Sequence, residues 1–554
     1  MSDKPVSFTN RQSLLNELKH NNNYDVIVIG GGIIGAGILR EACRKGLKVL
    51  LIEQGDFASG TSSRSSKMVH GGLRYIAQGD FKLTKHSVQE RERLLTAVPG
   101  LVNRMGYYFL LRKGQFPGRL IMSTLLSIYD WFAGIKDNRF ISKNEVTKTF
   151  NAIEENKLKG ACYYTDTVVD DARLVLRVLQ ESIADGGQVL NYVKAVKLVK
   201  DESEQVAGVF IKDAAQPQTE DDNPSEHIKL TSSVVINATG AWADKLRNEV
   251  VDEKRIRPLR GSHLLFSQQK LPITAALTLF HPEDNRPVFI STWEGVTLVG
   301  TTDLDHDENL DIEASISQKE VDYLLTVIAL YFPKSDIKAR DVLSSFAGVR
   351  PVISSDHNFK RNFTKKAPSK ERRDHAVWAN NGLITASGGK LTTFRLTAID
   401  ALNAAMPWLK TKFDSAKQSQ SNKVFATPDL NDFKNINLNN STSEWQQRIL
   451  GRYGNNAKHL FAEENNGELS LIDASQFCLA ECRWAAKHEA VNHLDDLLLR
   501  RTRLGLLLKN GAQQLFPELA AICQQELGWN EQKWQDEVVR YQTIWQKHYS
   551  LPTQ

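Results

Sequence analysis

The stretch YDVIVIGGGIIGAG, residues 24–37, decides the fold of the N-terminal part of the chain. It starts as an apolar run typical of a buried strand, passes through Gly30-x-Gly32-x-x-Gly35 and continues with a helical pattern. The next apolar run, KVLLIE, ends at Glu53, 18 residues beyond Gly35. A strand, a glycine turn, a helix and a second strand in this order predict a Rossmann-like βαβ unit.

Every part of this unit has a task in dinucleotide binding. The glycines let the backbone turn tightly and approach a pyrophosphate, to which the helix N-terminus offers free N–H groups and a positive dipole end. Glu53 supplies a carboxylate that accepts hydrogen bonds from ribose hydroxyls. A turn that only packs a helix on a sheet would explain the glycines but would leave Glu53 without a role. We therefore predict dinucleotide binding, although this motif by itself does not separate NAD from FAD.

Further motifs follow in order along the chain. The first, GTSSRSSKMVHGGLRYI at residues 60–76, holds too many small hydrogen-bonding residues for a routine loop. The others are VVDDARLV (168–175), VINATGAWAD (235–244), RGSHLLF (260–266), VGTTD (299–303), AGVRP (347–351), GGKLTTFR (388–395) and, as a fainter match, RRTRLG (500–505). Together with the glycine turn they closely resemble the FAD-dependent glycerol-3-phosphate dehydrogenases over about residues 24–400.

The resemblance implies an enzyme and its reaction. Members of this family use FAD and oxidise sn-glycerol 3-phosphate to dihydroxyacetone phosphate by hydride transfer to flavin N5. We expect membrane quinone as the electron acceptor, because the chain shows no long insertion of the kind found in the oxidase branch. Three alternatives stay open: an oxygen-using glycerol-3-phosphate oxidase, an amine or amino-acid oxidase of the same superfamily, and a non-catalytic FAD-binding protein whose C-terminal domain docks a partner.

By the same resemblance, distant segments close around the cofactor. Residues 62–67 contact FAD, residues 70–73 pass beside the flavin, residues 238–240 lie at the adenine-ribose end, and residues 388–393 lie at the isoalloxazine end. The residues expected to bind FAD are Gly30, Gly32, Gly35, Glu53, Thr61, Ser62, Ser66, Lys67, Gly71, Gly72, Leu73, Ala238, Gly240, Gly389, Lys390, Leu391 and Thr392.

The expected substrate is a phosphate monoester with nearly two negative charges, so its pocket needs fixed cations. The resemblance places Arg74, Arg350, Arg373 and Lys390 in that pocket. The apolar neighbours of Arg350 in FAGVRPV argue against a merely solvated side chain. Arg373 belongs to the charged run SKERRDH, in which Arg372 is a rival for the same role.

The candidate base is His263 in RGSHLLF, because an imidazole titrates near neutrality and can accept the hydroxyl proton. Isolated histidines are more often structural, and the motif match favours function without separating a base from a side chain that only positions the substrate. Tyr75, next to Arg74, is expected to help hold the glycerol hydroxyls. Lys390 is also expected to steady negative charge on the reduced flavin. We assign catalysis to His263, Arg350 and Lys390.

The composition excludes several classes of protein. Hydrophobic residues at 41% and charged residues at 24% are ordinary for a folded globular protein. The net charge of +5, from 70 basic and 65 acidic residues, gives no global field of the kind that marks a nucleic-acid binder. Cys478 and Cys482, with His488 and His493 downstream, raise the question of a metal, but a buried helix face explains the cysteines better and we expect no metal.

The expected location is cytoplasmic. The chain has five scattered cysteines, which suits a reducing compartment. Residues 1–23 lack the apolar core of a secretory signal, and no run of 18 apolar residues could span a bilayer. We expect peripheral association with the inner face of the cytoplasmic membrane. The expected partners are glycerol 3-phosphate, membrane quinone and an anionic membrane surface, and a homodimer is left open.

The order of the motifs predicts interleaved domains within an α/β architecture. Runs rich in β-branched and aromatic residues at 263–267, 288–292 and 296–301 predict an antiparallel sheet. After an N-terminal extension (1–23), we assign approximately 24–100, 160–255 and 340–400 to a Rossmann-like FAD-binding domain, and 101–159 and 256–339 to a substrate domain built on that sheet.

The C-terminal part reads differently. Residues 401–443 include polar runs such as NLNNSTS and are expected to be a linker, and residues 444–554 carry the helical patterns of a C-terminal helical domain. Residues 479–508 read as one amphipathic helix. Its segment LLLRRTRLGLLL (497–508) predicts leucines that face the core and a basic outer face.

Residues 101–140 are the segment expected at the membrane. This window holds eight aromatic residues, and six basic residues against two acidic ones. The aromatic residues singled out are Tyr107, Tyr108, Phe109, Tyr129, Trp131 and Phe132, and the basic ones are Arg104, Arg112, Lys113, Arg119, Lys136 and Arg139. Apolar rings could enter the headgroup boundary while the cations meet anionic lipid. The alternative is a helical pair packed on the main domain with a solvated basic face.

Overall fold

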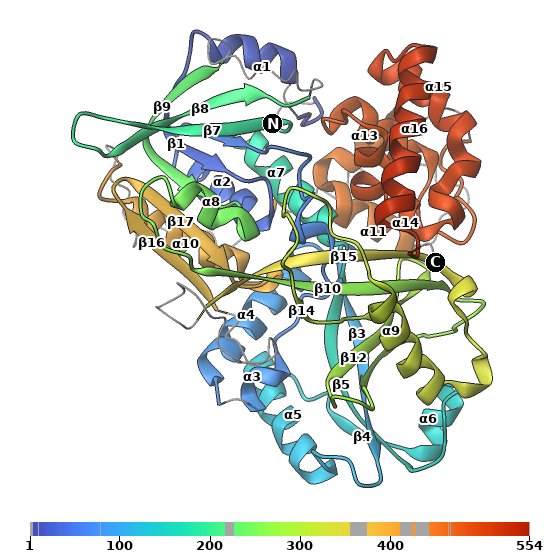
Figure 1. The fold of residues 1–554 in the computed structure, drawn as a ribbon. Helices are drawn as coiled ribbons and strands as arrows, with labels where there is room; N and C mark the ends of the chain where they lie inside the picture. Colours follow the sequence, from blue (N-terminus) through green and yellow to red (C-terminus); the bar gives the residue numbers. More distant parts are fainter. Residues whose placement is uncertain are drawn as a thin grey trace.

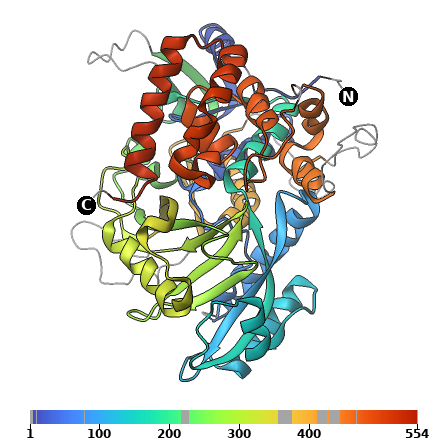
Figure 2. The same cartoon turned by 90° about the vertical axis from the view of Figure 1, so that its right-hand side faces the viewer.

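The computed structural model describes residues 4–8, 10–77, 79–215, 227–354, 374–409, 424–426, 443–463, 465 and 467–552. These residues form a sheet on the glycine-marked segments, a second sheet next to it and a group of C-terminal helices (Figure 1). Seen from the side, the C-terminal helices lie above the second sheet (Figure 2). None of the helices in this described part combines the length and the apolarity that crossing a membrane requires.

The first sheet collects the glycine-marked segments. Its strand order is β16-β17-β9-β1-β2-β6, with β7 and β8 joined to it through β9. β1 pairs in parallel with β2 on one side and with β9 on the other, and β17 is parallel to β9. The bounds are β1 (Asn23–Ile29), β2 (Val49–Ile52), β6 (Gln188–Leu190), β7 (Val193–Lys200), β8 (Val206–Asp213), β9 (Ile228–Asn237), β16 (His375–Asn380) and β17 (Leu383–Gly388).

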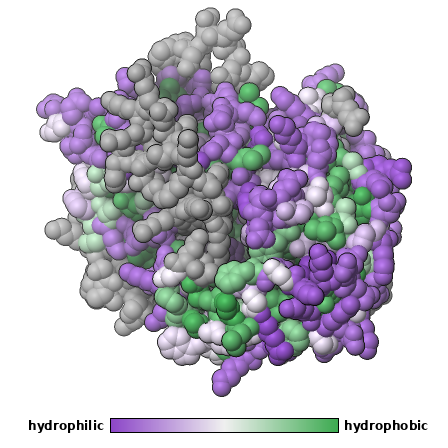
Figure 3. Space-filling view, turned by 60° about the horizontal axis from the view of Figure 1, so that its bottom comes forward, coloured by the Kyte–Doolittle hydropathy of each residue, from purple (hydrophilic) through white to green (hydrophobic). Residues whose placement is uncertain are grey.

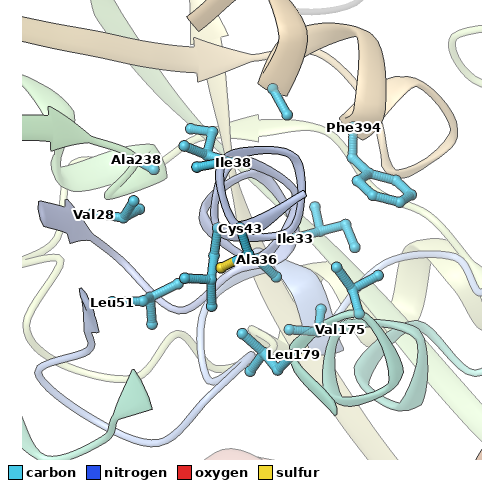
Figure 4. Close-up of a cluster of buried hydrophobic side chains, with 14 of the residues drawn as sticks. Val28, Ile33, Ala36, Ile38, Cys43, Leu51, Val175, Leu179, Ala238 and Phe394 are labelled. Carbon is cyan, nitrogen blue, oxygen red and sulfur yellow. The ribbon is translucent and has the colours of Figure 1, made fainter. Parts of the chain in front are cut away.

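Both faces of this sheet are covered, which explains the uninterrupted apolar runs of β1 and β2. On one face lie α2 (Ile33–Cys43), α7 (Asp171–Ala184) and α10 (Phe394–Ala405). On the other face lie α1 (Arg11–Leu18) and the β7–β8 hairpin. Figure 4 shows Ile33, Ala36 and Ile38 of α2 among Val28, Leu51, Val175, Leu179 and Phe394.

The second sheet contains the strand runs predicted from β-branched residues, and its antiparallel character is confirmed. Its order is β14-β10-β13-β12-β11-β3-β5-β4, and β15 pairs with β10 along their length. Only the β3–β11 pair is parallel among its described strands. The bounds are β3 (Val102–Arg112), β4 (Arg139–Ser142), β5 (Leu158–Val169), β10 (Ile256–Ser267), β11 (Ala276–Phe280), β12 (Pro287–Trp293), β13 (Val296–Gly300), β14 (Leu304–Asp305) and β15 (Val342–Ile353).

Helices also cover both faces of the second sheet. α9 (Gln318–Tyr331) buries Val321, Leu324 and Ile328 against Leu264 and Val299 of the sheet. The opposite face carries α3 (Leu73–Ala77), α4 (Phe81–Ala97) and α5 (Arg119–Ala133). The segment 101–140 is therefore a strand, a helix and a second strand, and not a pair of helices.

The C-terminal region is helical, as predicted. Its helices are α11 (Ser443–Tyr453), α12 (Ala457–Ala462), α13 (Leu479–His488), the π-helical turn η11 (Asp496–Arg501), α14 (Leu504–Leu507), α15 (Phe516–Leu527) and α16 (Glu531–His548). One apolar cluster joins α13, η11, α14, α15 and α16 to Leu265, Trp293 and Phe346 of the second sheet, and a separate cluster joins α11 and α12 to α13. The fold class, a Rossmann-like FAD-binding part with an antiparallel sheet and a helical C-terminal region, is confirmed.

Two expectations for residues 479–508 were wrong. The segment is not one helix, because the backbone has positive φ at Ala490 and at Arg503, which separate α13, η11 and α14. The basic residues do not form an outer face either: Arg500, Arg501 and Arg503 are 4%, 0% and 1% exposed. They point inward because buried carboxylates from distant parts of the chain neutralise them.

Candidate active site

A cavity of about 810 Å³ lies at the carboxyl ends of β1 and β9. Its lining comes from the glycine turn, Glu53, and residues 59–62, 238–242 and 388–391. Ligands of open α/β sheets bind at this end of the strands, and the volume falls in the usual range for ligand and cofactor sites.

The glycine turn brings the backbone close to this cavity. Gly30 has a φ of +115°, and a Cβ there would lie 2.6 Å from the carbonyl oxygen of Ala238. Gly32 precedes α2 as its N-cap residue. The hydroxyl oxygen of Ser62 accepts a hydrogen bond from the N–H of Ile33 at 3.0 Å, so Ser62 marks the positive end of the α2 dipole.

Glu53 is held in a fixed orientation at the cavity wall. Its two carboxylate oxygens accept hydrogen bonds from the N–H groups of Gly31, at 2.7 Å, and Gly55, at 2.9 Å. Burial raises the pKa of Glu53, against the opposing effect of these backbone hydrogen bonds. Gly35 stands in the first turn of α2, where a Cβ would lie only 1.9 Å from the carbonyl oxygen of Gly30.

Other residues predicted to bind FAD lie in two different settings. Thr61, Ala238, Gly240, Gly389, Lys390 and Leu391 line the cavity. Thr392 does not line it but donates a hydrogen bond to the carbonyl oxygen of His70 at 3.1 Å. A close backbone approach, a helix N-terminus and an oriented carboxylate fit the pyrophosphate and ribose of FAD.

His263 lies on β10 in a buried setting. Its Nε2 is 2.9 Å from the hydroxyl oxygen of Ser66, and its ring stacks on Phe346 at 4.6 Å. Nδ1 makes no hydrogen bond with the described part of the chain. Burial, and then Arg350 and Lys67, hold the pKa of His263 well below its usual range. The imidazole is therefore neutral at neutral pH and can accept a proton.

Arg350 on β15 belongs to a small charge cluster. One nitrogen of its guanidinium is 3.3 Å from the Asp303 carboxylate, and another donates to the hydroxyl oxygen of Thr301 at 3.0 Å. Arg286 reaches the other oxygen of Asp303, also at 3.3 Å. Two cations thus share one buried carboxylate. A Cβ on Gly261 would lie 2.5 Å from Arg350, so this glycine makes room for the guanidinium.

Lys390 and Tyr75 are in contact next to Gly72. The ammonium nitrogen of Lys390 lies 3.8 Å from the centroid of the Tyr75 ring and donates to the Ser87 hydroxyl at 2.8 Å. Gly72 has a φ of +81°, and a Cβ there would lie 2.2 Å from the Tyr75 ring. The backbone N–H of Gly71 donates to the Tyr129 hydroxyl at 2.9 Å, just before Leu73 opens α3.

Lys67 is turned away from the cavity. Its ammonium nitrogen lies 2.9 and 3.0 Å from the two carboxylate oxygens of Asp171 and donates to the carbonyl oxygen of Ser63 at 2.6 Å. Burial, and then the charge of Arg503, lower the pKa of Lys67 to about 7. Direct FAD contact by Lys67 stays a prediction. So does phosphate binding by Arg74, whose side chain is outside the described part, and by Arg372 or Arg373, which lie outside the described residues.

Reasoning from the sequence missed several residues of this site. Arg286 directly precedes β12, and Asp303 follows β13 closely. Because β12 pairs with β13, Arg286 and Asp303 lie next to each other. Ser87 of α4 was missed because it follows no glycine motif. Asp171 and Arg503 lie inside motifs that the sequence singled out, but their contact joins residues 332 positions apart.

Comparison with known proteins defines the class. Residues 25–395 match the family model of FAD dependent oxidoreductases, and residues 414–534 match that of the C-terminal domain of alpha-glycerophosphate oxidase. The chain belongs to the FAD-dependent oxidoreductases. It is 30% identical over 519 residues to the aerobic glycerol-3-phosphate dehydrogenase of Staphylococcus haemolyticus, covering 90% of this chain and 89% of that protein. Within the class, it is a member of the glycerol-3-phosphate dehydrogenase family.

Further comparisons of sequence and fold give the same family. The aerobic glycerol-3-phosphate dehydrogenase of Staphylococcus saprophyticus is 31% identical, with 90% of this chain and 89% of that protein covered. The fold is similar to the FAD complex of glycerol-3-phosphate dehydrogenase from Bacillus halodurans, with a TM-score of 0.72, 24% identity and 98% and 97% of the two chains covered. The fold is also similar to that of L-alpha-glycerophosphate oxidase from Mycoplasma pneumoniae, with a TM-score of 0.54 and 17% identity, and with 73% of this chain and 98% of that chain covered. The predicted family, cofactor and enzyme class are confirmed.

Proposed function

We propose that the protein oxidises sn-glycerol 3-phosphate to dihydroxyacetone phosphate and passes the electrons to membrane quinone. The observation that carries this proposal is the position of His263 and Arg350 on paired strands. Phe346 lies opposite His263, and Arg350 follows Phe346 by four positions on β15. Because side chains alternate along a strand, His263, Phe346 and Arg350 project from the same face. A proton acceptor and a cation suited to bind phosphate thus lie on the same face of the second sheet.

The reaction removes a proton from the C2 hydroxyl and a hydride from C2 itself. Bound FAD supplies the two-electron acceptor for the hydride. We assign the proton to Nε2 of His263 and propose that the Ser66 hydroxyl, 2.9 Å away, relays it: Ser66 takes the proton of the substrate hydroxyl as its own proton passes to that nitrogen. The low pKa of His263 keeps the imidazole unprotonated at neutral pH, which a proton acceptor requires.

Arg350 and Arg286 bind the substrate phosphate in this proposal. Both arginine side chains are 23% exposed, whereas the side chain of Asp303 is buried, so a ligand can approach the arginines from the exposed side. Planar guanidiniums match the geometry of phosphate oxygens, and Asp303 holds both in place before the substrate arrives.

Lys390 and Tyr75 complete the proposed site. Lys390 lines the cavity next to Gly389, and the Ser87 hydroxyl fixes its ammonium group. In this position its charge stabilises the negative charge that develops during the reaction. Tyr75, packed under that ammonium group, is suited to contact the glycerol part of the substrate.

An anaerobic titration tests the proposal. The purified protein should be yellow, and glycerol 3-phosphate should bleach the flavin band at about 450 nm without added nicotinamide. Glycerol, which lacks the phosphate, is the matched control and should leave the band unchanged at the same concentration. Bleaching by glycine or another amine, but not by glycerol 3-phosphate, would favour an amine or amino-acid oxidase.

The electron acceptor is tested by reoxidation. After anaerobic reduction, a soluble quinone analogue and air-saturated buffer are mixed separately with the enzyme. We expect reoxidation by the quinone to be much faster than by oxygen. Rapid reoxidation by oxygen with a matching yield of peroxide would instead favour the oxidase alternative.

The proposed route to the quinone is a membrane contact on α5 and its flanks. Phe116, Leu120 and Trp131 are 72%, 82% and 76% exposed, which is unusual for side chains of this size. Figure 3 brings this end of the molecule forward and shows hydrophobic residues gathered there. Exposed basic residues flank them on the same segment, including Lys113 and Arg119. An apolar face rimmed by cations suits an anionic lipid surface.

Some residues expected at the membrane do not reach the surface. Tyr107 and Phe109 of β3 and Tyr129 of α5 are buried in the core between this strand and this helix. The Arg112 guanidinium is half-buried, because it donates to the carbonyl oxygen of Asn156 at 3.0 Å and lies over the Tyr331 ring. The proposed contact, called the α5 face below, therefore comprises Phe116, Leu120, Ile121 and Trp131 with Lys113, Arg119 and Lys136.

A further inference from the structure

Arg503 connects the C-terminal helices to the interior of the FAD-binding part. It lies between η11 and α14 and is 1% exposed. Its guanidinium donates to Asp170 at 3.1 Å, to the carbonyl oxygen of Leu499 at 2.7 Å and to the carbonyl oxygen of Ser63 at 3.1 Å, and it forms an ion pair with Asp171. One side chain thus holds its own helical turn, the start of α7 and residue 63 together.

Residues 63–67, called the serine loop here, fold around the carboxylate of Asp171. One oxygen of that carboxylate accepts hydrogen bonds from the N–H of Ser65 at 2.9 Å and from its hydroxyl at 2.7 Å. The Ser65 hydroxyl oxygen in turn accepts a hydrogen bond from the N–H of Lys67 at 3.0 Å, and the Lys67 ammonium group closes the loop on Asp171. Asp171, held by Arg503, therefore sets the shape of the loop.

The serine loop ends at the candidate base. Ser66 stands between the two residues that bind Asp171, and its hydroxyl is 2.9 Å from Nε2 of His263. Lys67 adopts a φ of +57°, a backbone conformation that needs support when the residue is not glycine. A shift of the loop would therefore move the Ser66 hydroxyl away from the imidazole.

The buried charges show why Arg503 is needed in this place. Asp170 and Asp171 are adjacent buried carboxylates, and their cations are Arg452, Arg503 and Lys67. Burying a carboxylate is costly unless a cation and hydrogen bonds compensate it. Of these three cations, only Arg503 and Lys67 pair with Asp171. Without Arg503, Lys67 would be the one of the three that still pairs with Asp171, and Lys67 is itself a residue of the serine loop.

We infer that Arg503 is a positioning residue for the oxidation: by holding Asp171 and the Ser63 carbonyl it fixes the serine loop, so that Ser66 meets His263. The C-terminal helices are then part of the active site. This inference rests on the proposed function in one respect, the assignment of His263 to the substrate proton.

The test is a double-mutant cycle between Arg503 and Ser66 in the full-length FAD-loaded protein. Arg503→Gln should lower the limiting rate of anaerobic flavin reduction about tenfold or more, with little change in the Kd for glycerol 3-phosphate and in FAD content. Ser66→Ala should lower the same rate. The double variant should be no slower than Ser66→Ala, because Arg503 acts through Ser66. Additive effects, or an unchanged rate in Arg503→Gln, would overturn the inference.

A matched control separates positioning from stability. Arg483 is another C-terminal arginine with two carboxylate partners, Glu468 and Glu526, but it does not contact the serine loop. Arg483→Gln should lower the Tm and leave the rate of flavin reduction as in the wild type. A crystal structure of Arg503→Gln adds a readout independent of activity: the Ser66 hydroxyl should have moved from His263. An unmoved Ser66 would also overturn the inference.

Two further variants keep the test decisive if Arg503→Gln fails to fold. Ser65→Ala removes both hydrogen bonds of the Ser65 hydroxyl and keeps every charge, so it should fold and still reduce the flavin slowly. Arg503→Lys restores a cation and should recover part of the rate. Failure of wild-type protein to bleach with glycerol 3-phosphate would refute the proposed function. A wild-type rate in Ser65→Ala would refute the role of the loop.

Discussion

Arg286 and Arg350 reach the two oxygens of one buried carboxylate, that of Asp303, at 3.3 Å each. Asp303 fixes both guanidiniums before any ligand binds, and such preorganisation reduces the entropy that binding costs. The arrangement is the basis for the first prediction.

Arg350→Ala should reduce kcat/KM for glycerol 3-phosphate about tenfold or more, because charge-assisted hydrogen bonds contribute roughly 1.5–3 kcal/mol each. Arg286→Ala should have an effect of the same kind. FAD content, measured by absorbance, should stay normal in both variants. Arg257→Ala is the control, since Arg257 pairs with Asp305 on the same sheet, and it should lower stability but not substrate affinity. Normal efficiency in Arg350→Ala would exclude that residue from phosphate binding.

His263→Ala should slow anaerobic flavin reduction by about 10²–10⁴-fold, the usual range for a lost acid–base catalyst. The measurement is stopped-flow absorbance over a range of substrate concentrations. The control is His281→Ala, which removes another buried histidine, one that stacks on Tyr323 at 3.6 Å. That variant should lose stability but keep its rate. If His263→Ala changes only the Kd, His263 positions the substrate and another group accepts the proton.

The low pKa of His263 makes a prediction about pH. Burial is the main cause, and Arg350 and Lys67 add to it. The wild-type rate of flavin reduction should therefore stay level as the pH falls through about 6.5, where an ordinary imidazole would be half protonated. Stability should decrease in the same range, because the unfolded chain binds a proton there that folded His263 does not. A fall in rate with a midpoint at about pH 6.5 would contradict this assignment.

The sequence was enough to predict the glycine turn and the carboxylate beside it, but not the full charge network. The glycine turn and Glu53 are neighbours in sequence and in space, so their spacing predicts their geometry. His263 and Arg350 were found through motif resemblance, and strand pairing brings them together. Arg286 carries no local signal, because its partner Asp303 is defined only by the pairing of β12 with β13. Arg503 was misplaced because its pattern predicts a solvated face, whereas carboxylates more than 300 residues away bury it.

Gly35→Ala should prevent normal FAD binding. The new Cβ would lie 1.9 Å from the carbonyl oxygen of Gly30, and relief requires the glycine turn to move away from the cofactor. Overpacking of this kind typically costs about 1–3 kcal/mol. The measurements are Tm and the ratio of flavin to protein. Gly118→Ala is the control, because a Cβ there meets no atom of the chain within 4 Å, and it should behave as the wild type. Full FAD content and an unchanged Tm in Gly35→Ala would contradict the close approach.

The α5 face should bind anionic vesicles at low salt and release them at high salt. Phe116, Leu120 and Trp131 expose most of their apolar surface, and replacing all three by Ser should weaken binding at every salt concentration.

Replacing Lys113, Arg119 and Lys136 by Ala should weaken binding only at low salt. At roughly 1 kcal/mol for each well-placed cation, the loss should be about a hundredfold. Co-sedimentation with vesicles containing anionic phospholipid measures both effects. Val539→Ser removes an apolar side chain that is 62% exposed on α16, and it should leave binding unchanged. Both triple variants should keep anaerobic flavin reduction but lose reoxidation by quinone held in vesicles, because the proposed contact delivers electrons and not substrate. Binding unaffected by either triple variant would refute the assignment of the α5 face.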